Sequence, residues 1–281
     1  MSETKDFRIG TYNIGNSERT SNSPFDLREP DVLDAIHAID CDILVLNELQ
    51  EYRDSVNRKN VSVSYFLGRM SNYDHIYQYT TPSTNSFAIG ILYKKRKFFH
   101  VKTVCIPLPG NRILLGAQFL FKLNNNQPFW IWATYLTTCI EEIKLSCELI
   151  AKYILKEVDE STDYFLLGDF QLFNFQPEHE KILKKFIDIS GLYDVGQKTI
   201  FSFDNSMDCY GTYLGFHDSP YRVSTNEFFE EQTSSRVDFI FATKDAKTSL
   251  CQAHATTLSE INNQFAPSDH LPIFCSVQLS S

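Results

Sequence analysis

The sequence lacks several features that would assign it to a specialised class of protein. Its seven cysteines are scattered and include no Cys-x-x-Cys, which argues against a disulfide framework and predicts reduced thiols. It has no Gly-x-Ser-x-Gly and no Gly-x-x-x-x-Gly-Lys-Ser/Thr, so a serine hydrolase or a P-loop enzyme has little support. It has no signal peptide and no apolar run long enough to span a bilayer. We therefore expect a cytoplasmic protein, with export by a route without a cleaved signal left open.

Positive charge is also scarce, since 26 Lys and Arg face 35 Asp and Glu for a net charge of -9. This balance argues against a protein that coats nucleic acid by charge alone, although a local site with bound cations could accept a phosphate. No linker rich in Pro or Gly divides the chain, and 43% of its residues are apolar. We expect one domain over residues 1–281, with its core in residues 7–279.

Apolar runs with the length of strands outnumber helical patterns along the chain. Asn124 to Gln127 carries a hairpin signal between two such runs, and the basic run Lys94 to Lys97 is expected to be a solvated turn. This pattern favours two packed sheets with helices outside. Strands are expected at residues 7–13, 41–48, 87–93, 112–123, 128–136, 164–168, 237–241 and 271–279, and helices at residues 27–39, 140–158 and 177–187.

The stretch Tyr164 to Gln171 organises our interpretation of the chain. Its apolar start has the length of a buried strand, and Gly168 ends it. Asp169 and Gln171 then stand at alternate positions, so on extended backbone they would face the same spot. That spot would lie at the end of a strand, where α/β proteins bind ligands. The alternative is a strand that ends in a turn, with Asp169 as a helix cap.

Several other apolar runs end in, or carry, a side chain suited to phosphate chemistry. Each has a structural alternative: Asn13 as a turn former, Glu48 as an exposed strand end, Asp238 as a partner of Arg236, and His270 as a structural histidine. Their joint appearance, each attached to a strand-like run, favours a functional site. The full set is Asn13, Glu48, Asp169 with Gln171, Asp238, and Asp269 with His270.

These motifs resemble the endonuclease/exonuclease/phosphatase superfamily, whose members include deoxyribonucleases, abasic-site endonucleases, inositol-phosphate phosphatases and neutral sphingomyelinases. The resemblance implies an α/β fold of the deoxyribonuclease-I type. This fold is a four-layer α/β sandwich in which two mixed, mostly antiparallel β-sheets pack face to face with helices outside. The matching segments are residues 11–13, 42–48, 168–170, 211–216, 237–241 and 268–272.

The resemblance also implies a divalent cation, Mg²⁺ with Mn²⁺ as an alternative. Glu48 would bind the cation, Asp269 would be a second metal or site-organising carboxylate, and Asn13 would help to hold the metal site and a phosphoryl oxygen. Hard carboxylate oxygens suit Mg²⁺. Leu49-Gln50-Glu51 spells the family's Leu-Gln-Glu, but the spacing from Asp42 and the unbroken strand favour Glu48 over Glu51.

The remaining family roles concern water and the phosphate. Asp169 would position or deprotonate the attacking water, and His270, held by Asp238, would act as a base or contact the phosphate. Two departures stand out: Gln171 replaces the usual Asn, and Tyr135 replaces a histidine that many members use near the leaving group. A longer amide displaces its donor, and a shift of about 1 Å can cost roughly 100-fold in rate.

The sequence therefore predicts a Mg²⁺-dependent phosphoesterase that hydrolyses a phosphodiester, most simply as a monomer. Nucleic acid, nucleotides, phospholipid head groups and inositol phosphates all remain as substrates. The alternative is a catalytically weak or inactive binding protein on the same scaffold, because of Tyr135 and Gln171. Substrate loops are expected at residues 15–25, 49–85, 172–180 and 203–235; the last contains His217, Asp218 and Arg222, of which only Arg222 is considered for a phosphate contact.

Overall fold

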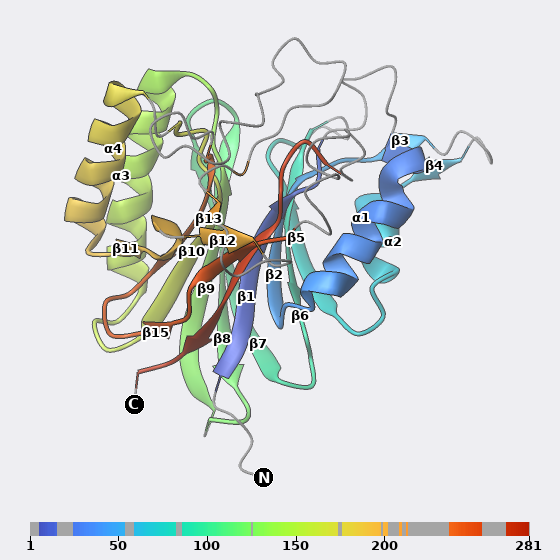
Figure 1. Cartoon of the computed structure of the whole chain (residues 1–281), viewed down its shortest axis with the longest axis horizontal. Coiled ribbons are helices and arrows are strands. Elements are labelled where there is room, and N and C mark those ends of the chain that lie inside the picture. Colours follow the sequence, from blue (N-terminus) through green and yellow to red (C-terminus); the bar gives the residue numbers. More distant parts are fainter. Residues whose placement is uncertain are drawn as a thin grey trace.

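Two β-sheets lie face to face at the centre of the molecule, and helices cover their outer faces (Figure 1). The computed structural model describes residues 6–15, 25–53, 59–82, 86–124, 126–173, 176–197, 199–201, 208–209, 212, 236–254 and 268–280. Within those residues, no helix is both long and apolar enough to cross a bilayer.

The first sheet is mixed, and among the described residues it has nine strands. β1 pairs in parallel with β2 and antiparallel with β17. β15 (Lys247–Thr248) pairs with β17, and β3 (Tyr52–Arg53) and β4 (Asn60–Val61) form a separate pair. The order across the first sheet is β13 (Asp208–Cys209), β12 (Thr199–Phe201), β16 (Cys251–Ala253), β17 (Ile273–Gln278), β1 (Asp6–Asn13), β2 (Ile43–Leu49), β6 (Ala88–Tyr93) and β5 (Asp74–Tyr79).

The second sheet has six described strands and carries the longest antiparallel run. β10 is parallel to β9 and antiparallel to β14, and the predicted hairpin between residues 112 and 136 is confirmed as β8 and β9. The order is β11 (Tyr193–Asp194), β14 (Asp238–Ala242), β10 (Asp163–Asp169), β9 (Gln127–Tyr135), β8 (Arg112–Phe121) and β7 (Phe98–Leu108).

The helices form the two outer layers. α1 (Phe25–Ile39) and α2 (Val63–Gly68) pack against the first sheet, on the right in Figure 1. α3 (Ile140–Glu157) and α4 (Pro177–Ser190) pack against the second sheet, and the short 3-10 helix Val195–Gln197 follows β11. The predicted four-layer sandwich of two mixed sheets between helices is confirmed.

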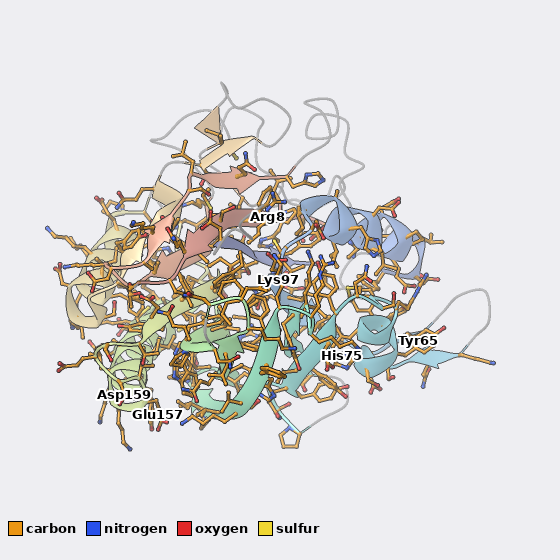
Figure 2. The ribbon with its side chains drawn as sticks, turned by 90° about the horizontal axis from the view of Figure 1, so that it is seen from below. Arg8, Tyr65, His75, Lys97, Glu157 and Asp159 are labelled. Carbon is orange, nitrogen blue, oxygen red and sulfur yellow. The ribbon has the colours of Figure 1, made fainter. Side chains whose placement is uncertain are left out.

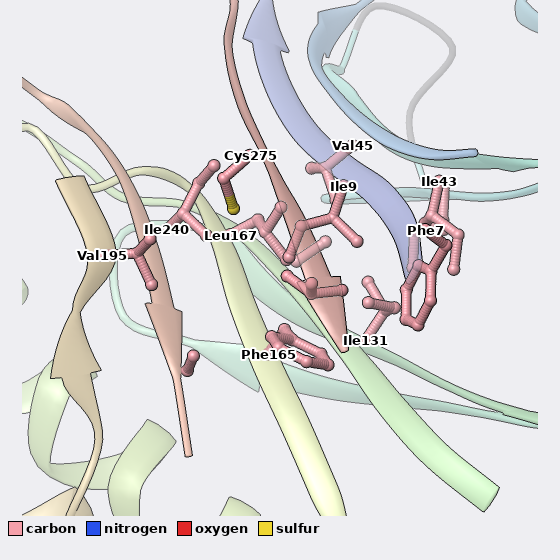
Figure 3. Close-up of a cluster of buried hydrophobic side chains, with 14 of the residues drawn as sticks. Phe7, Ile9, Ile43, Val45, Ile131, Phe165, Leu167, Val195, Ile240 and Cys275 are labelled. Atoms are coloured by element: carbon pink, nitrogen blue, oxygen red, sulfur yellow. The ribbon is translucent and has the colours of Figure 1, made fainter. Parts of the chain in front are cut away.

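Alternation along the strands divides the core. In β10, Phe165 and Leu167 point between the sheets, whereas Leu166 joins the cluster under α3 and α4. In β1, Phe7 and Ile9 also point between the sheets, and Figure 3 shows these rings and aliphatic side chains meeting there. Since neighbouring residues of a strand face opposite sides, a two-sided apolar strand belongs to the interior of such a sandwich.

The basic turn expected to be solvated is partly buried, which corrects the prediction. Lys94 is 4% exposed, and its ammonium contacts Asp40 Oδ1 at 2.7 Å and Asp42 Oδ1 at 3.1 Å. Lys97 contacts Asp42 Oδ2 at 2.7 Å, and the backbone N–H of Arg8 donates to the same oxygen at 3.0 Å. Arg8 and Lys97 lie close together in Figure 2. The run therefore ties the turn to the start of β1 and β2.

Candidate active site

Four strands deliver polar side chains to one end of the space between the sheets. Asn13, Tyr135, Asp169 and Asp238 keep the inward parity of the apolar residues on β1, β9, β10 and β14. The strand register sets Asp169 opposite both Tyr135 and Asp238. All four side chains are at most 4% exposed. The site is thus a polar continuation of the inter-sheet core.

Gly168 makes this end of β10 fit against β9. Its φ is +146°, and a Cβ placed on it would lie 1.9 Å from the carbonyl oxygen of Thr134. A larger residue would push the two strands apart just before Asp169. The glycine that ends the predicted strand is therefore a packing requirement of the site.

A β-bulge turns Glu48 into the site. In a regular strand Glu48 would share the outward face of Leu44 and Leu46, under α1. The pairing of β2 with β6 shifts register between Leu46 and Leu49, and Glu48 has a φ of +59°. The extra residue redirects its carboxylate, as bulges do next to functional sites. Glu48 is 9% exposed.

One amide group joins the two sheets at the site. Asn13 Nδ2 donates to Glu48 Oε1 at 3.3 Å and to Asp169 Oδ2 at 3.0 Å. Its Oδ1 accepts from the N–H of Gly15 at 3.1 Å, which fixes the rotamer. Asn13 therefore holds two carboxylates from different sheets close to one another. The contact with Gly15 is that of a turn former, but the same side chain also binds both carboxylates, and Glu48 is not an exposed strand end.

Asn47 makes a second bridge between the sheets. With its amide oriented to suit both partners, it donates to the carbonyl of Thr134 and accepts from the N–H of Asp169, each at 3.2 Å. Glu51 lies apart from these contacts, because its Oε1 accepts from the hydroxyl of Tyr79 at 3.1 Å. The structure thus brings Glu48, and not Glu51, to Asn13 and Asp169.

His270 and Asp238 form a buried pair. His270 Nδ1 lies 2.9 Å from Asp238 Oδ2, and His270 Nε2 lies 3.9 Å from Asp169 Oδ2. Ser268 Oγ donates to the carbonyl of Asn13 at 2.7 Å and anchors the segment that carries Asp269 and His270. The alternative in which Asp238 pairs with Arg236 is wrong.

Arg236 pairs with Asp194, not with Asp238; its Nη1 donates to Asp194 Oδ1 at 3.2 Å. Thr212 supports Asp238 instead. Its Oγ1 accepts from the N–H groups of Val237 and Asp238 at 3.1 Å each, and its carbonyl accepts from the N–H of Leu271 at 2.8 Å. Thr212 therefore ties the start of β14 to the segment after His270.

Burial and neighbouring charges shift the pKa values of Asp169, His270 and Asp269. Burial, followed by repulsion from Asp238, raises the pKa of Asp169 to about 7, although His270 and hydrogen bonds from Gln171 and Asn13 oppose the shift. Burial alone would lower the pKa of His270, but Asp238, Asp269 and Asp169 raise it to about 10. Burial and Glu48 raise the pKa of Asp269. In the cation-free protein His270 is therefore positive at neutral pH.

The donor set fits a hard divalent cation. Among the described residues, the ligand atoms of Asp169, Asp238 and His270 lie within 4.8 Å of one another; a protonated His270 cannot bind a cation, but Glu48 adjoins this cluster through Asn13, which donates to both Glu48 and Asp169. Asp238 Oδ1 is buried and has no hydrogen-bond partner in the part of the chain that the structure describes, which is costly for a carboxylate oxygen. Carboxylate and amide oxygens, without a thiolate among these residues, suit Mg²⁺ or Mn²⁺.

The two departures from the family pattern occupy defined positions. Tyr135 donates its hydroxyl to Glu48 Oε1 at 2.6 Å, and its ring lies 4.1 Å from the guanidinium carbon of Arg112. Gln171 turns back on Asp169: its N–H donates to Oδ1 at 2.9 Å and its Nε2 to Oδ2 at 2.7 Å. Both replacements contact a carboxylate of the site.

Sequence reasoning missed Arg28, which interacts electrostatically with Glu48 and Asp269. Its signal was available: Phe25, Arg28 and Val32 have the spacing of one helical stripe, so Arg28 falls among apolar positions of α1. His217, Asp218 and Arg222 lie outside the described residues, as does most of the 203–235 loop.

Solved structures share this fold. An endonuclease/exonuclease/phosphatase from Bacteroides vulgatus aligns with a TM-score of 0.72 at 19% identity, over 98% of this chain and 99% of that one. A mannosyl-6-phosphatase from Bacteroides thetaiotaomicron gives 0.69 at 17% identity, over 96% and 99%. Danio rerio TDP2, complexed with a single-strand DNA product, gives 0.69 at 17% identity, over 98% and 99%.

Sequence comparison identifies the family. Uncharacterized protein L388 of Acanthamoeba polyphaga mimivirus is 25% identical over 156 residues, which span 50% of this chain and 56% of that relative. The chain thus matches little more than half the length of this curated relative. A sequence model described as the endonuclease/exonuclease/phosphatase family matches residues 10–270. The protein belongs to the endonuclease/exonuclease/phosphatase family.

Proposed function

We propose that the protein is a divalent-metal-dependent phosphoesterase that hydrolyses a phosphodiester by attack of water. The observation that carries the proposal is the amide of Asn13, which lies within hydrogen-bond distance of both Glu48 and Asp169. The Asp238–His270 pair stands beside them. Buried carboxylates, an amide donor and an imidazolium in one place suit the chemistry of an anionic phosphate.

Glu48, Asp269 and Asn13 would hold the cation, Mg²⁺ or alternatively Mn²⁺. When bound, the cation neutralises the anionic phosphoester and the charge that develops on it. Tyr135 acts on this set through Glu48, since its hydroxyl donates to Oε1. Burial, together with Glu48 and Asp169, raises the pKa of Tyr135 well above its usual value, so the hydroxyl remains a donor.

Asp169 is the residue that positions or deprotonates the attacking water. Its carboxylate accepts from the N–H and Nε2 of Gln171 and from Nδ2 of Asn13, which fixes its orientation. Since a carboxylate with a pKa near 7 can exchange a proton at neutral pH, Asp169 suits a general base. His270, positive and held by Asp238, contacts the phosphate in preference to accepting a proton.

The decisive experiment is a panel of phosphoesters assayed with Mg²⁺, with Mn²⁺ and with a chelator. It should contain single-stranded DNA, a dinucleotide, an inositol phosphate, a phospholipid and a sugar phosphate. The panel includes both sugar phosphates and DNA because one structure of the same fold carries the name of a sugar phosphatase and another was solved with a single-strand DNA product. Turnover of one diester, lost with the chelator and restored by Mg²⁺, is the expected result. No turnover of any member would overturn the proposal.

The second candidate is a binding protein with weak or no catalysis. It is favoured by one observation, the close contact of Gln171 Nε2 with Asp169 Oδ2 at 2.7 Å, which engages the oxygen needed for a water molecule. This protein would bind a phosphoester in the presence of Mg²⁺ without turning it over. Binding measured by calorimetry beside the same assay separates the two candidates.

A further inference from the structure

Arg28 is a buried cation in the first turns of α1. It is 6% exposed and shares the buried stripe of the helix with Phe25 and Val32. Its guanidinium carbon lies 5.5 Å from the centre of the Phe25 ring. Arginine is almost never this buried without compensating partners, since removing a charge from water is costly. The position therefore requires an explanation from what the side chain faces.

The guanidinium reaches the turn that follows Asn13. Arg28 Nη1 donates to the carbonyl of Ile14 at 3.3 Å, and Nη2 lies 3.5 Å from the carbonyl of Gly15. The N–H of Gly15 in turn donates to Asn13 Oδ1, the contact that fixes the amide between the two sheets. Arg28 thus holds the backbone on which the orientation of Asn13 depends.

The contacts place Arg28 near the carboxylates of the site, because it donates to the carbonyls of Ile14 and Gly15, directly after the Asn13 that donates to Glu48. Burial lowers the pKa of Arg28, and Tyr12, Asp269 and Glu48 oppose that effect. Glu48 and Asp269 are the two carboxylates proposed above to hold the cation. Without a cation their negative charges repel each other. The positive charge of Arg28 beside these carboxylates reduces their repulsion. The same charge also repels a divalent ion that binds to them.

We propose that Arg28 is a positioning residue that holds the turn after Asn13 and balances the charge of Glu48 and Asp269. The inference rests on the proposed metal-dependent function. Two effects follow from a fixed cation at this place: the cation-free site stays folded, and its affinity for a divalent ion is moderated. With a divalent ion bound, the ion and Arg28 together carry one positive charge more than Glu48 and Asp269 carry negative charges. This excess favours the binding of an anionic phosphate.

The test compares Arg28→Gln, which removes the charge, with Arg28→Lys, which keeps it. The matched control is Arg8→Met, because Arg8 also donates to a main-chain carbonyl, that of Ile39 at 2.6 Å, but lies at the other end of β1. Binding of Mn²⁺ without substrate is followed by the electron paramagnetic resonance of the free ion. The melting temperature of each protein is measured with and without Mn²⁺.

We expect R28Q to bind Mn²⁺ about tenfold more tightly than the wild type, because the loss of a repulsive charge outweighs the loss of two long hydrogen bonds, of 3.3 and 3.5 Å, to the turn after Asn13. Its cation-free form should melt at a lower temperature, and Mn²⁺ should raise that temperature by more than in the wild type. R28K should keep the wild-type dissociation constant within a factor of about three, because it keeps the positive charge even though a lysine cannot reproduce both carbonyl contacts of the guanidinium. R8M should leave Mn²⁺ binding unchanged whatever its melting temperature.

A purely structural role predicts the opposite sign: R28Q would lose stability and bind Mn²⁺ as weakly as, or more weakly than, the wild type. That result overturns the inference while the proposed function stands. A dissociation constant for R28K that differs from the wild-type value by much more than a factor of about three also overturns it, and this comparison remains decisive if R28Q does not fold. A wild type that binds no Mn²⁺ overturns the proposed function and the inference together.

Discussion

Tyr135 donates its hydroxyl to Oε1 of Glu48 at 2.6 Å, across the gap between the two sheets. The same oxygen accepts from Asn13 Nδ2 at 3.3 Å, so two strands other than its own hold the Glu48 carboxylate. Glu48 itself stands on a bulge with an unusual φ of +59°. The tyrosine therefore helps to fix the carboxylate that the bulge brings into the site.

Tyr135→Phe should raise the Mg²⁺ concentration for half-maximal activity about tenfold, because a hydrogen bond to a charged group is worth roughly 1.5–3 kcal/mol. At saturating Mg²⁺ the rate should recover most of its wild-type value. Tyr79→Phe is the matched control, since Tyr79 donates to Glu51 in the same way outside the site. A change in the maximal rate alone, at an unaltered Mg²⁺ requirement, would contradict the role in holding Glu48.

Glu48→Gln should nearly abolish metal-dependent activity, whereas Glu51→Gln should leave it within a factor of about two. The change removes a charge without removing volume, so the loss reports on cation binding rather than on packing. Titration of activity with Mg²⁺ and Mn²⁺ checks both variants. If Glu51→Gln has the larger effect, the assignment of the metal ligand to the end of β2 is wrong.

Part of the candidate site could be predicted from the sequence, because strand parity is a local property. Asn13, Asp169 and Asp238 continue the inward side of apolar strands, and that periodicity can be counted without knowing the fold. Glu48 could not be placed by the same rule, because in a regular strand it would face α1. Only the register shift against β6 reverses it, and pairing between distant strands leaves no trace in the local pattern.

The sequence did not indicate the strands β7 and β5, because many of their side chains are exposed to solvent. β7 is a long edge strand with side chains exposed over residues 99–103, so it has no alternation of apolar and polar positions. β5 is a similar case, an edge strand whose side chains are half-buried or exposed. Lys94 looked like surface because its partners, Asp40 and Asp42, lie more than fifty residues away and meet it only in the fold.

The pH profile should show two limbs. Asp169 must be ionised, so at low Mg²⁺ the rate should rise with pH through about 7, and saturating Mg²⁺ should move that limb to lower pH. His270 must be protonated, so the rate should fall as pH passes about 10. Measuring kcat/KM from pH 5 to 11 at two Mg²⁺ concentrations checks both signs.

Asp238→Asn should move the alkaline limb to lower pH by at least about one unit, because Asp238 is the strongest of the charges that raise the pKa of His270. His270→Ala should lower kcat by orders of magnitude, and the double variant should be little worse, since the pair acts as a unit. His179→Ala, which removes a histidine that accepts from the N–H of Phe173, should leave the profile unchanged. An alkaline limb that Asp238→Asn does not move would assign it to another group.

Asp42→Asn should destabilise the fold by about 3 kcal/mol, because it removes the buried charge that both Lys94 and Lys97 contact and leaves the buried Lys94 with the exposed Asp40 as its charged partner. Although burial alone would raise it, hydrogen bonds from Lys97, the Arg8 N–H and Lys94 lower the pKa of Asp42 below 3.8. Its contribution is thus present above the pKa of about 3.9 that an aspartate has in the unfolded chain, and it is lost as the pH falls through the lowered value. Urea unfolding at pH 7 and pH 3 measures both effects. Lys185→Met, which breaks the exposed pair with Glu148, should leave the midpoint unchanged.

Gln171 decides between the two candidate functions. Its backbone has a φ of +53°, a region that Asn tolerates well, so Gln171→Asn tests the side chain without straining the turn. If the site is fitted to glutamine, the shorter amide loses its contact with Asp169 Oδ2, and kcat should fall about tenfold, as expected for one hydrogen bond to a carboxylate. The limb assigned to Asp169 should also move to higher pH, since a donor to its ionised form is gone. Gln171→Ala should show the same shift with a larger loss. A rise in kcat of tenfold or more in the asparagine variant would instead mean that the glutamine restrains Asp169, and would favour the weakly catalytic binding protein.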